Sequence, residues 1–264
     1  MPSVPKKKPV VRRPAKAPAR MTLGETMRAL EQAGSAQTRK TYARHGAAEP
    51  MFGVSFATLK VLTKRIGVDH ELALALWNTG NFDAHNLAVK IADPALMTPA
   101  DLDRWARETS ATRMCGGYVG MLAAEGPHGA TKAAQWLASK DGRERSAGWS
   151  LLGQLAQRDE TTPDALFEQR LAEIERTIHS APSSEREGMN LAVITIGGRS
   201  AALRKAAVAA AKRIGRVEVD HGDTACQTPD AAAYIAKAWA HSTSKGFESP
   251  AAQERTRETP RRRC

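Results

Sequence analysis

The sequence predicts an all-α protein, and three observations lead to this expectation. Apolar residues recur at three- and four-residue spacing, as with Phe56, Leu59 and Leu62. Ser, Thr and Asp residues stand at many positions where a helix needs an N-cap. The only segment with the alternation of a strand, "RVEVD" at 216–220, is short. Roughly ten to twelve helices of this kind would form a globular bundle or an α-solenoid of stacked helix pairs.

The expected helices can be placed by their capping residues. Thr22 and Glu25 form a capping-box pattern, and Gly34 ends the first helix. Further helices are expected to begin near Ser35, Ser55, Asp69, Asp141, Pro163 and Pro229.

The two ends of the chain differ from its middle in charge. Residues 1–20 contain seven Lys and Arg and no acid, and residues 250–264 contain five Arg against two Glu. These ends hold ten of the eleven net positive charges. Because such segments have little apolar surface to bury, we expect disordered basic tails at 1–20 and 244–264, around a helical domain at 21–243.

Composition also argues against several classes of protein. No apolar run reaches the roughly 18 residues that a membrane span needs, and the first residues lack the apolar core of a signal peptide, so we expect a cytoplasmic protein. Cys115, Cys226 and Cys264 form no CxxC pair, which argues against a disulfide framework and a zinc finger. We expect no metal and no cofactor.

Two segments resemble a known family. "MFGVSFATLKVLTK" (51–64) and "LWNTGNFDAHNLAVKIADP" (76–94) resemble, in the same order, two segments of the AlkD-like DNA alkylation repair enzymes. The resemblance covers about residues 21–240. It implies a right-handed α-solenoid of HEAT-like helix pairs whose concave face follows duplex DNA. It also implies removal of cationic alkylated purines, such as 7-methylguanine and 3-methyladenine, without metal or cofactor.

The catalytic pattern of that family is only partly present. The family uses a Trp and an Asp in a "WDxCD" stretch to stabilise the sugar cation, and an Arg to hold a phosphate. Laid over "TRMCG", this stretch places Cys115 on the family cysteine, with Thr112 at the Trp position and Arg113 and Gly116 at the Asp positions. We therefore leave the catalytic residues unassigned, and Arg113 suits phosphate better than a sugar cation.

Three further residues could supply parts of the family's catalytic pattern. Asp103 and Glu108 are the acids that could replace the absent aspartate. Arg145 falls where the phosphate-holding Arg is expected, and it opens an otherwise apolar stripe that includes Trp149. Its guanidinium either reaches water at the helix end or pairs with a DNA phosphate.

The segment at 197–217 contains six basic residues and no acid. In a helical projection Lys205, Lys212 and Arg216 point in one direction, opposite an apolar face. A solvated surface helix normally mixes both signs of charge, so nucleic-acid contact is favoured over a plain solvated face.

Two other features have structural interpretations. Asp220, His221, Asp223 and Cys226 could be drawn as a metal site, but their spacing matches no familiar zinc arrangement, so a structural loop is favoured. His85 stands where the resemblance leads one to expect Arg, and we expect it on a helix surface.

These observations predict a monomeric, DNA-binding, HEAT-like protein of DNA repair that recognises alkylated or otherwise altered double-stranded DNA, including branched DNA, without need of glycosylase activity. One alternative is an active glycosylase with substituted catalytic residues. The other is a solenoid scaffold for protein partners.

Overall fold

The computed structural model describes residues 20–109, 113–221 and 224–263. The helices in these ranges are α1 (Leu23–Ala33), α2 (Ala36–Arg44), α3 (Phe56–Ile66), α4 (His70–Trp77), α5 (Phe82–Ile91), α6 (Pro99–Glu108), α7 (Arg113–Glu125), α8 (Gly129–Leu137), α9 (Gly142–Arg158), α10 (Asp164–Thr177), α11 (Ser183–Gly197), α12 (Ala201–Ile214), α13 (Ala231–Ser244), α14 (Pro250–Arg255) and α15 (Pro260–Arg263). Apart from one isolated bridge between Gly34 and Val54, the described residues form no β-structure. The predicted all-α class is confirmed.

The predicted capping residues start most of these helices. Thr22 and Glu25 form the complete capping box of α1. The side chains at four other predicted starts also cap a helix, namely Ser35, Ser55, Asp69 and Asp141. Pro163 precedes α10, whereas α13 begins one residue later than expected, with Asp230 as its N-cap.

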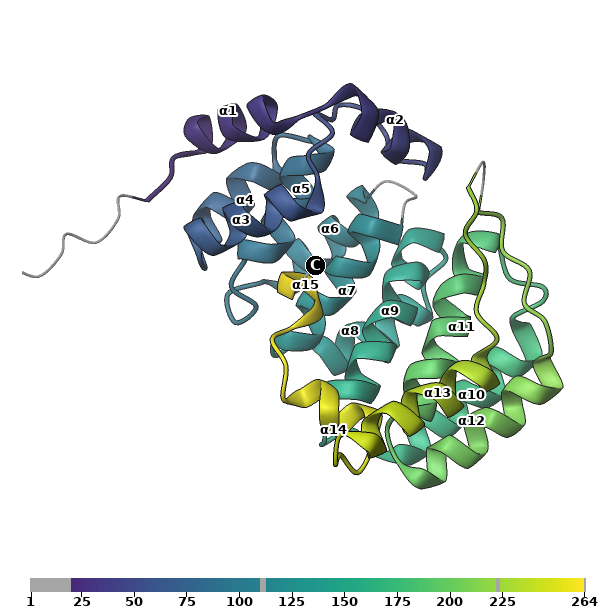
Figure 1. Cartoon of the computed structure of the whole chain (residues 1–264). Helices are drawn as coiled ribbons and strands as arrows, with labels where there is room; N and C mark the ends of the chain where they lie inside the picture. The colour runs from purple at the N-terminus through teal and green to yellow at the C-terminus, as the bar shows by residue number, and fades with distance from the viewer. Residues whose placement is uncertain (1–19, 110–112, 222–223, 264) are drawn as a thin grey trace, which may run out of the picture.

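The helices follow one another along a curved path (Figure 1), from α1 and α2 at one end to α10, α12 and α13 at the other. α9 lies near the middle and packs against α7, α8 and α11. Neighbours in sequence pack as pairs, for example α4 with α5 and α11 with α12. Of the two architectures that the sequence allows, the structure is the solenoid of stacked helix pairs. None of the helices in the described ranges combines the length and the apolar character required for a membrane span.

Every residue of α5 is buried, including its polar ones. The carboxylate of Asp83 accepts hydrogen bonds from the backbone N–H groups of Phe52 (2.6 Å), Gly53 (3.0 Å) and Val54 (2.8 Å). Gly53 has a φ of 80°, and a Cβ there would lie 2.5 Å from the carbonyl oxygen of Ser35, so a larger residue does not fit. The two segments that carry the family resemblance are thus joined directly.

His85 differs from its prediction. Its side chain lies inside the fold, 8% exposed, because α5 is covered on all sides. The imidazole stacks on Trp77 with ring centroids 4.0 Å apart, and its Nε2 lies 2.8 Å from the Trp77 carbonyl oxygen. Burial lowers the pKa of His85 and outweighs the carbonyl contact that raises it. The expectation of a surface histidine is wrong.

The C-terminal segment (residues 245–263) also differs from its prediction. The sequence predicts a disordered tail beyond residue 243, but the segment forms α14 beside α9 and then crosses to α15 beside α3, α5 and α7. In Figure 1 this yellow segment runs from the α13 end of the solenoid back to its centre. Composition misleads here because the arginines find acceptors inside the fold. The predicted tail at 1–20 lies, except for Arg20, outside the described residues.

Arg261 holds this segment in place. Its side chain is 3% exposed, and Nη1 donates to the carbonyl oxygens of Val89 (2.7 Å), Lys90 (3.1 Å) and Ala92 (3.3 Å) at the end of α5. Nε donates to Glu125 at 2.9 Å. In return, the buried Lys90 ammonium donates to the Arg261 carbonyl oxygen at 2.8 Å. The last carbonyls of a buried helix need donors, and Arg261 supplies them.

Candidate nucleic-acid interface

Three exposed cations lie on α12 and just beyond its end. Lys205, Lys212 and Arg216 are exposed, and within the described residues none of them forms an ion pair or a hydrogen bond. Apolar side chains of α12, including Leu203 and Ile214, are buried on its inner side. We call these three residues the α12 basic face. Because it lacks carboxylate partners, its positive charge is available to a polyanion.

The helix itself ends before the third of these cations. Gly215 takes a φ of 70° and ends α12. Arg216 therefore lies in the following loop and not on the helix. Two neighbouring arginines are occupied: Arg204 stacks on Trp239 at 4.8 Å, and Arg213 pairs with Glu175 at 2.5 Å. Arg204 and Arg213 therefore have partners within the protein, unlike the three residues of the α12 basic face.

A shallow groove runs between α12 and α13. We call it the α12–α13 groove; basic residues and small apolar residues line it, namely Ala201, Arg204, Lys205, Val208, Ala209, Lys212, Ala232 and Ala236. The four alanines let a ligand backbone approach the helices closely, and the cations can neutralise phosphates there. This is the arrangement that a sequence-independent contact with a nucleic-acid backbone requires.

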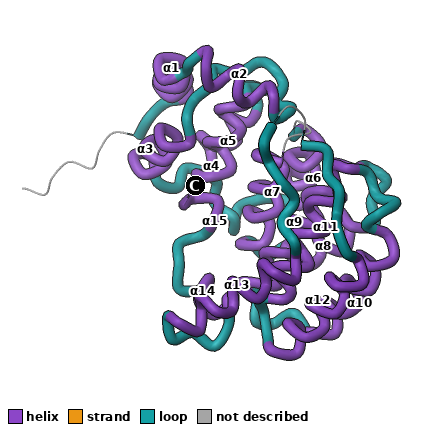
Figure 2. The backbone as a smooth tube through the Cα atoms, turned by 45° about the vertical axis from the view of Figure 1, so that its right-hand side comes forward, coloured by secondary structure: helices purple, strands orange, loops and turns teal. Residues whose placement is uncertain are grey.

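In the loop between α12 and α13, the described residues 215–221 and 224–230 form two extended arms (Figure 1). The arms run side by side in both Figure 1 and Figure 2. "RVEVD" lies in the first arm, which forms no strand. A hollow of about 890 Å³ opens between the arms and shares Lys212 and Ala232 with the α12–α13 groove. Sequence reasoning missed this hollow, and the only signal for it is a stretch without helical periodicity after Gly215.

The second arm of the loop approaches α2, which lies at the other end of the solenoid (Figure 1). A further hollow is lined by Arg44 and His45, at the end of α2, and by residues 224–226 of the second arm. It shares the exposed thiol of Cys226 with the hollow between the arms. Asp223 lies outside the described residues, and the imidazole of His221 is 3.0 Å from the Thr228 hydroxyl, a contact that joins the two arms. This contact gives His221 a structural partner and does not support a metal site in the loop.

Arg145 lies in the first turn of α9, as the sequence predicts, but its guanidinium is used within the protein. Nε and Nη2 donate to the two carboxylate oxygens of Glu185 at 2.9 and 2.6 Å, and Nη1 donates to the Ser139 carbonyl oxygen at 2.8 Å. The Glu185 side chain is only 5% exposed. Its hydrogen bonds raise the pKa of Arg145. Phosphate binding by Arg145 stays a prediction.

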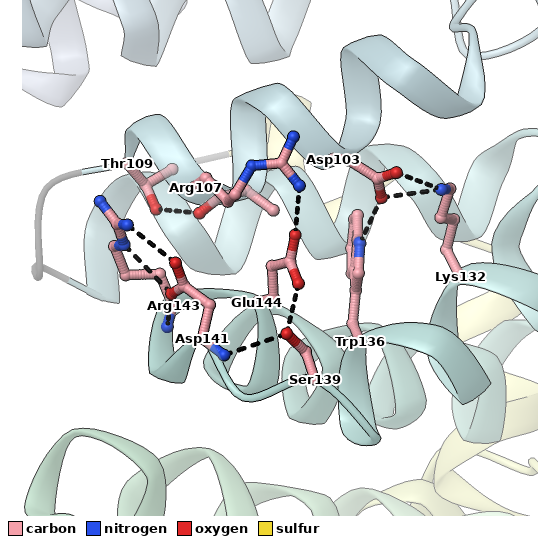
Figure 3. A network of polar contacts seen from close by, with 10 residues as sticks. Asp103, Arg107, Thr109, Lys132, Trp136, Ser139, Asp141, Arg143 and Glu144 are labelled. Atoms are coloured by element: carbon pink, nitrogen blue, oxygen red, sulfur yellow. Dashed lines mark hydrogen bonds and ion pairs between the residues drawn. The ribbon is translucent and has the colours of Figure 1, made fainter.

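Neighbouring residues at the start of α9 form further ion pairs (Figure 3). Arg107 donates to Glu144 at 2.6 Å, and Glu144 also accepts from the Ser139 hydroxyl at 2.5 Å. Arg143 donates to both oxygens of Asp141, and this contact lowers the pKa of Asp141 to about 2. We call these residues, with Arg145 and Glu185, the α9 cluster. Its three arginines each have a carboxylate partner, so little net charge remains.

The two acids that could replace the missing aspartate are also occupied. Asp103 accepts from the buried Lys132 ammonium at 2.7 Å and from Trp136 Nε1 at 2.8 Å (Figure 3). Glu108 accepts from Trp77 Nε1 at 2.6 Å. Each carboxylate therefore has a structural role.

The stretch that resembles the family's catalytic segment is described only in part. Thr112 lies outside the described residues. Arg113 and Cys115 belong to the first turns of α7, and Gly116 follows them in the same helix. The phosphate role predicted for Arg113 stays a prediction.

Comparisons with known proteins find relatives of the whole helical domain. A solved structure described as "a new family of proteins related to the HEAT-like repeat DNA glycosylases with affinity for branched DNA structures" matches with a TM-score of 0.76 and 32% identity, covering 87% of this chain and 98% of that one. An uncharacterized protein of Listeria innocua and another of Listeria monocytogenes are each 28% identical over 223 residues, which is 82% of this chain and 95% of theirs.

A family model confirms the resemblance seen in the sequence. The model described as "DNA alkylation repair enzyme" matches residues 26–235, most of the chain. That range begins in α1 and ends in α13, so it includes both the α9 cluster and the α12 basic face. The chain therefore belongs to the DNA alkylation repair enzyme family.

Proposed function

We propose that this protein binds DNA through the α12 basic face and the α12–α13 groove, and that it acts in DNA repair by recognising altered or branched DNA. The observation that carries the proposal is the group of three exposed cations without carboxylate partners in the described chain. Phosphates attract such cations, and release of the counterions condensed on DNA drives the association.

The family and the solved relative support a DNA ligand. The family is named for DNA alkylation repair, and the solved relative of 32% identity is described as having affinity for branched DNA structures. We extend that kind of ligand to this chain, acting as a cytoplasmic monomer. A scaffold for protein partners would have no need of unpaired cations along a groove.

The state of the carboxylates supports a binding role over base excision. Stabilising a sugar cation requires a carboxylate free to face it. Asp103, Glu108 and Glu185 each bind a cation or an indole N–H within the protein. We therefore propose recognition without glycosylase chemistry.

The test of DNA binding is the triple variant Lys205→Ala/Lys212→Ala/Arg216→Ala. Fluorescence anisotropy with a labelled duplex and a labelled four-way junction, over a series of salt concentrations, gives the affinity and its salt dependence. Loss of three phosphate contacts should flatten the slope of log K against log salt by about 2.7.

The matched control is Arg28→Ala/Lys64→Ala/Arg65→Ala, which removes three exposed cations from α1 and α3 at the other end of the solenoid. Equal loss of affinity in both triple variants would contradict the proposed surface. Excision is tested separately: release of free 7-methylguanine from alkylated DNA above the spontaneous rate would contradict the non-catalytic role.

A further inference from the structure

The hollow between the arms of the 215–230 loop is distinct in chemistry from the α12–α13 groove. We call it the loop hollow. Its lining includes Lys212, Arg216, Glu218, Val219, Gln227 and Thr228. Donors and acceptors of both charge signs therefore face one space, whereas the groove beside it has cations and no acid. A bare phosphate suits the groove better than the loop hollow, because the carboxylate of Glu218 repels it.

The rim of the loop hollow is held open by hydrogen bonds to the solenoid. In the first arm, the Asp220 N–H donates to the Ser183 hydroxyl at 2.7 Å. In the second arm, the Pro229 carbonyl oxygen accepts from the Asn190 amide at 2.9 Å. The His221–Thr228 contact at 3.0 Å joins the arms near their tip. The space is thus preformed, as ligand pockets usually are.

The size and lining fit one nucleotide. About 890 Å³ lies within the range of pockets that enclose small organic ligands. Ala211 and Val219 supply apolar surface for the faces of a planar ring. In the described chain the side chains of Glu218 and Gln227 have no partner, so both are available to the hydrogen-bonding edge of a base.

The position of the loop hollow connects it to a DNA backbone. Lys212 lines both the groove and the loop hollow, so a phosphate held at Lys212 has its own base within reach of the space between the arms. A base inside a duplex is stacked and paired, and its release costs a few kcal/mol, while an unpaired base costs least.

We propose that the loop hollow binds a single unpaired nucleotide of a DNA whose backbone lies on the α12 basic face. This inference rests on the proposed function, because the α12 basic face must hold the DNA. The inference adds a specific feature for the protein to recognise, namely a bulged or unpaired nucleotide. The backbone shape that all duplexes share would not provide such specificity.

The test compares a duplex that contains one bulged 2-aminopurine with a fully paired duplex of the same length. The wild-type protein should bind the bulged DNA at least fivefold more tightly, as expected for one base-edge contact, and should change the 2-aminopurine fluorescence. Val219→Phe narrows the loop hollow with a bulky ring and should weaken both the preference and the fluorescence change, while affinity for paired duplex is retained. Ala233→Phe, at an exposed position of α13 outside the hollow, is the matched control.

A second variant makes the result independent of packing at Val219. Gln227→Ala removes an exposed amide without adding bulk, and it should lower the preference for bulged DNA about threefold. Equal affinity of the wild-type protein for bulged and paired DNA would overturn the loop hollow and leave the proposed function standing. Failure to bind any DNA would overturn both. Unchanged preference in both variants would also reject the loop hollow.

Discussion

The C-terminal segment and α12 with its following loop are both rich in cations, but they use them in opposite ways. All five arginines from Arg255 to Arg263 form ion pairs with carboxylates, and Arg261 is buried. The three residues of the α12 basic face are exposed and have no such partner in the described chain. Positive composition alone therefore does not identify a nucleic-acid surface. The distinction is whether the protein itself supplies the anions.

The α9 cluster lies between these extremes. Its arginines are partly exposed, yet each has a carboxylate partner. The family resemblance points to Arg145 for phosphate binding, while the geometry assigns that guanidinium to Glu185. Arg261, the α9 cluster and the α12 basic face thus form a series: buried and paired charge, partly exposed and paired charge, and exposed charge without a partner in the described chain. Substitutions can shift a residue along this series.

The largest effect is expected at Arg261. Arg261→Met leaves three helix-end carbonyls and the Glu125 carboxylate without their donor, and the free energy of unfolding should fall by about 3–5 kcal/mol. Chemical denaturation measures this loss. Arg257→Met, which removes an exposed arginine with a single ion pair at 3.8 Å, should change stability by less than about 1 kcal/mol. Equal stability of the two variants would show that the C-terminal segment is a tail after all.

The opposite result is expected at Lys212. Lys212→Glu places a carboxylate where the α12–α13 groove meets the loop hollow, and DNA affinity should fall about tenfold or more at low salt. Stability should change by no more than about 0.5 kcal/mol, because the side chain is exposed and unpaired. Anisotropy and denaturation together check this, with Lys64→Glu on α3 as the control. A loss of affinity that persists in high salt would contradict an electrostatic origin.

The sequence predicts much of the fold because the information for it is local. Caps such as Ser55 and Asp69, and apolar periodicity, depend only on near neighbours, so the helices were predictable. The burial of His85 and Arg261 was not, because it depends on how separate helices pack: Trp77 of α4 stacks on His85, and the end of α5 accepts from Arg261. Arg261 meets α5 across roughly 170 residues, and no local pattern distinguishes it from the partly exposed arginines beside it.

The same reasoning separates the parts of the candidate site. An amphipathic projection finds Lys205 and Lys212 of the α12 basic face, since the burial of Leu203 and Ile214 fixes which side is exposed, but it does not place Arg216, which lies beyond the end of the helix. It does not find Glu185, whose pairing with Arg145 depends on the packing of α9 against α11. The loop hollow likewise depends on where two non-periodic arms are held by Ser183 and Asn190.

A smaller effect is expected when the α9 cluster is shifted toward available charge. Glu185→Gln removes the charge that neutralises Arg145 while keeping a hydrogen-bond acceptor. If Arg145 faces DNA, affinity for duplex should rise about threefold at low salt, and the gain should disappear at high salt. Glu173→Gln is the matched control, because it frees Arg170 on α10, an arginine as exposed as Arg145 that lies outside the α12 basic face. An equal rise in both variants would show that net charge alone accounts for the gain.

The smallest effect concerns acid stability at Asp141. Its pKa is lowered to about 2 by Arg143, below the value near 3.9 of an unfolded chain. The ion pair therefore stabilises the folded state above about pH 4, and this contribution is lost as the pH falls toward 2. Because Arg143 is half exposed and Asp141 is partly exposed, water screens the pair and the contribution should stay below about 1 kcal/mol. Asp141→Asn should lower stability at pH 7 by no more than that amount and make the loss of stability between pH 4 and 2 less steep. Denaturation curves of both proteins at pH 7, 4 and 2 check this. An equally steep loss of stability between pH 4 and 2 in the two proteins would show that solvent already screens the pair completely.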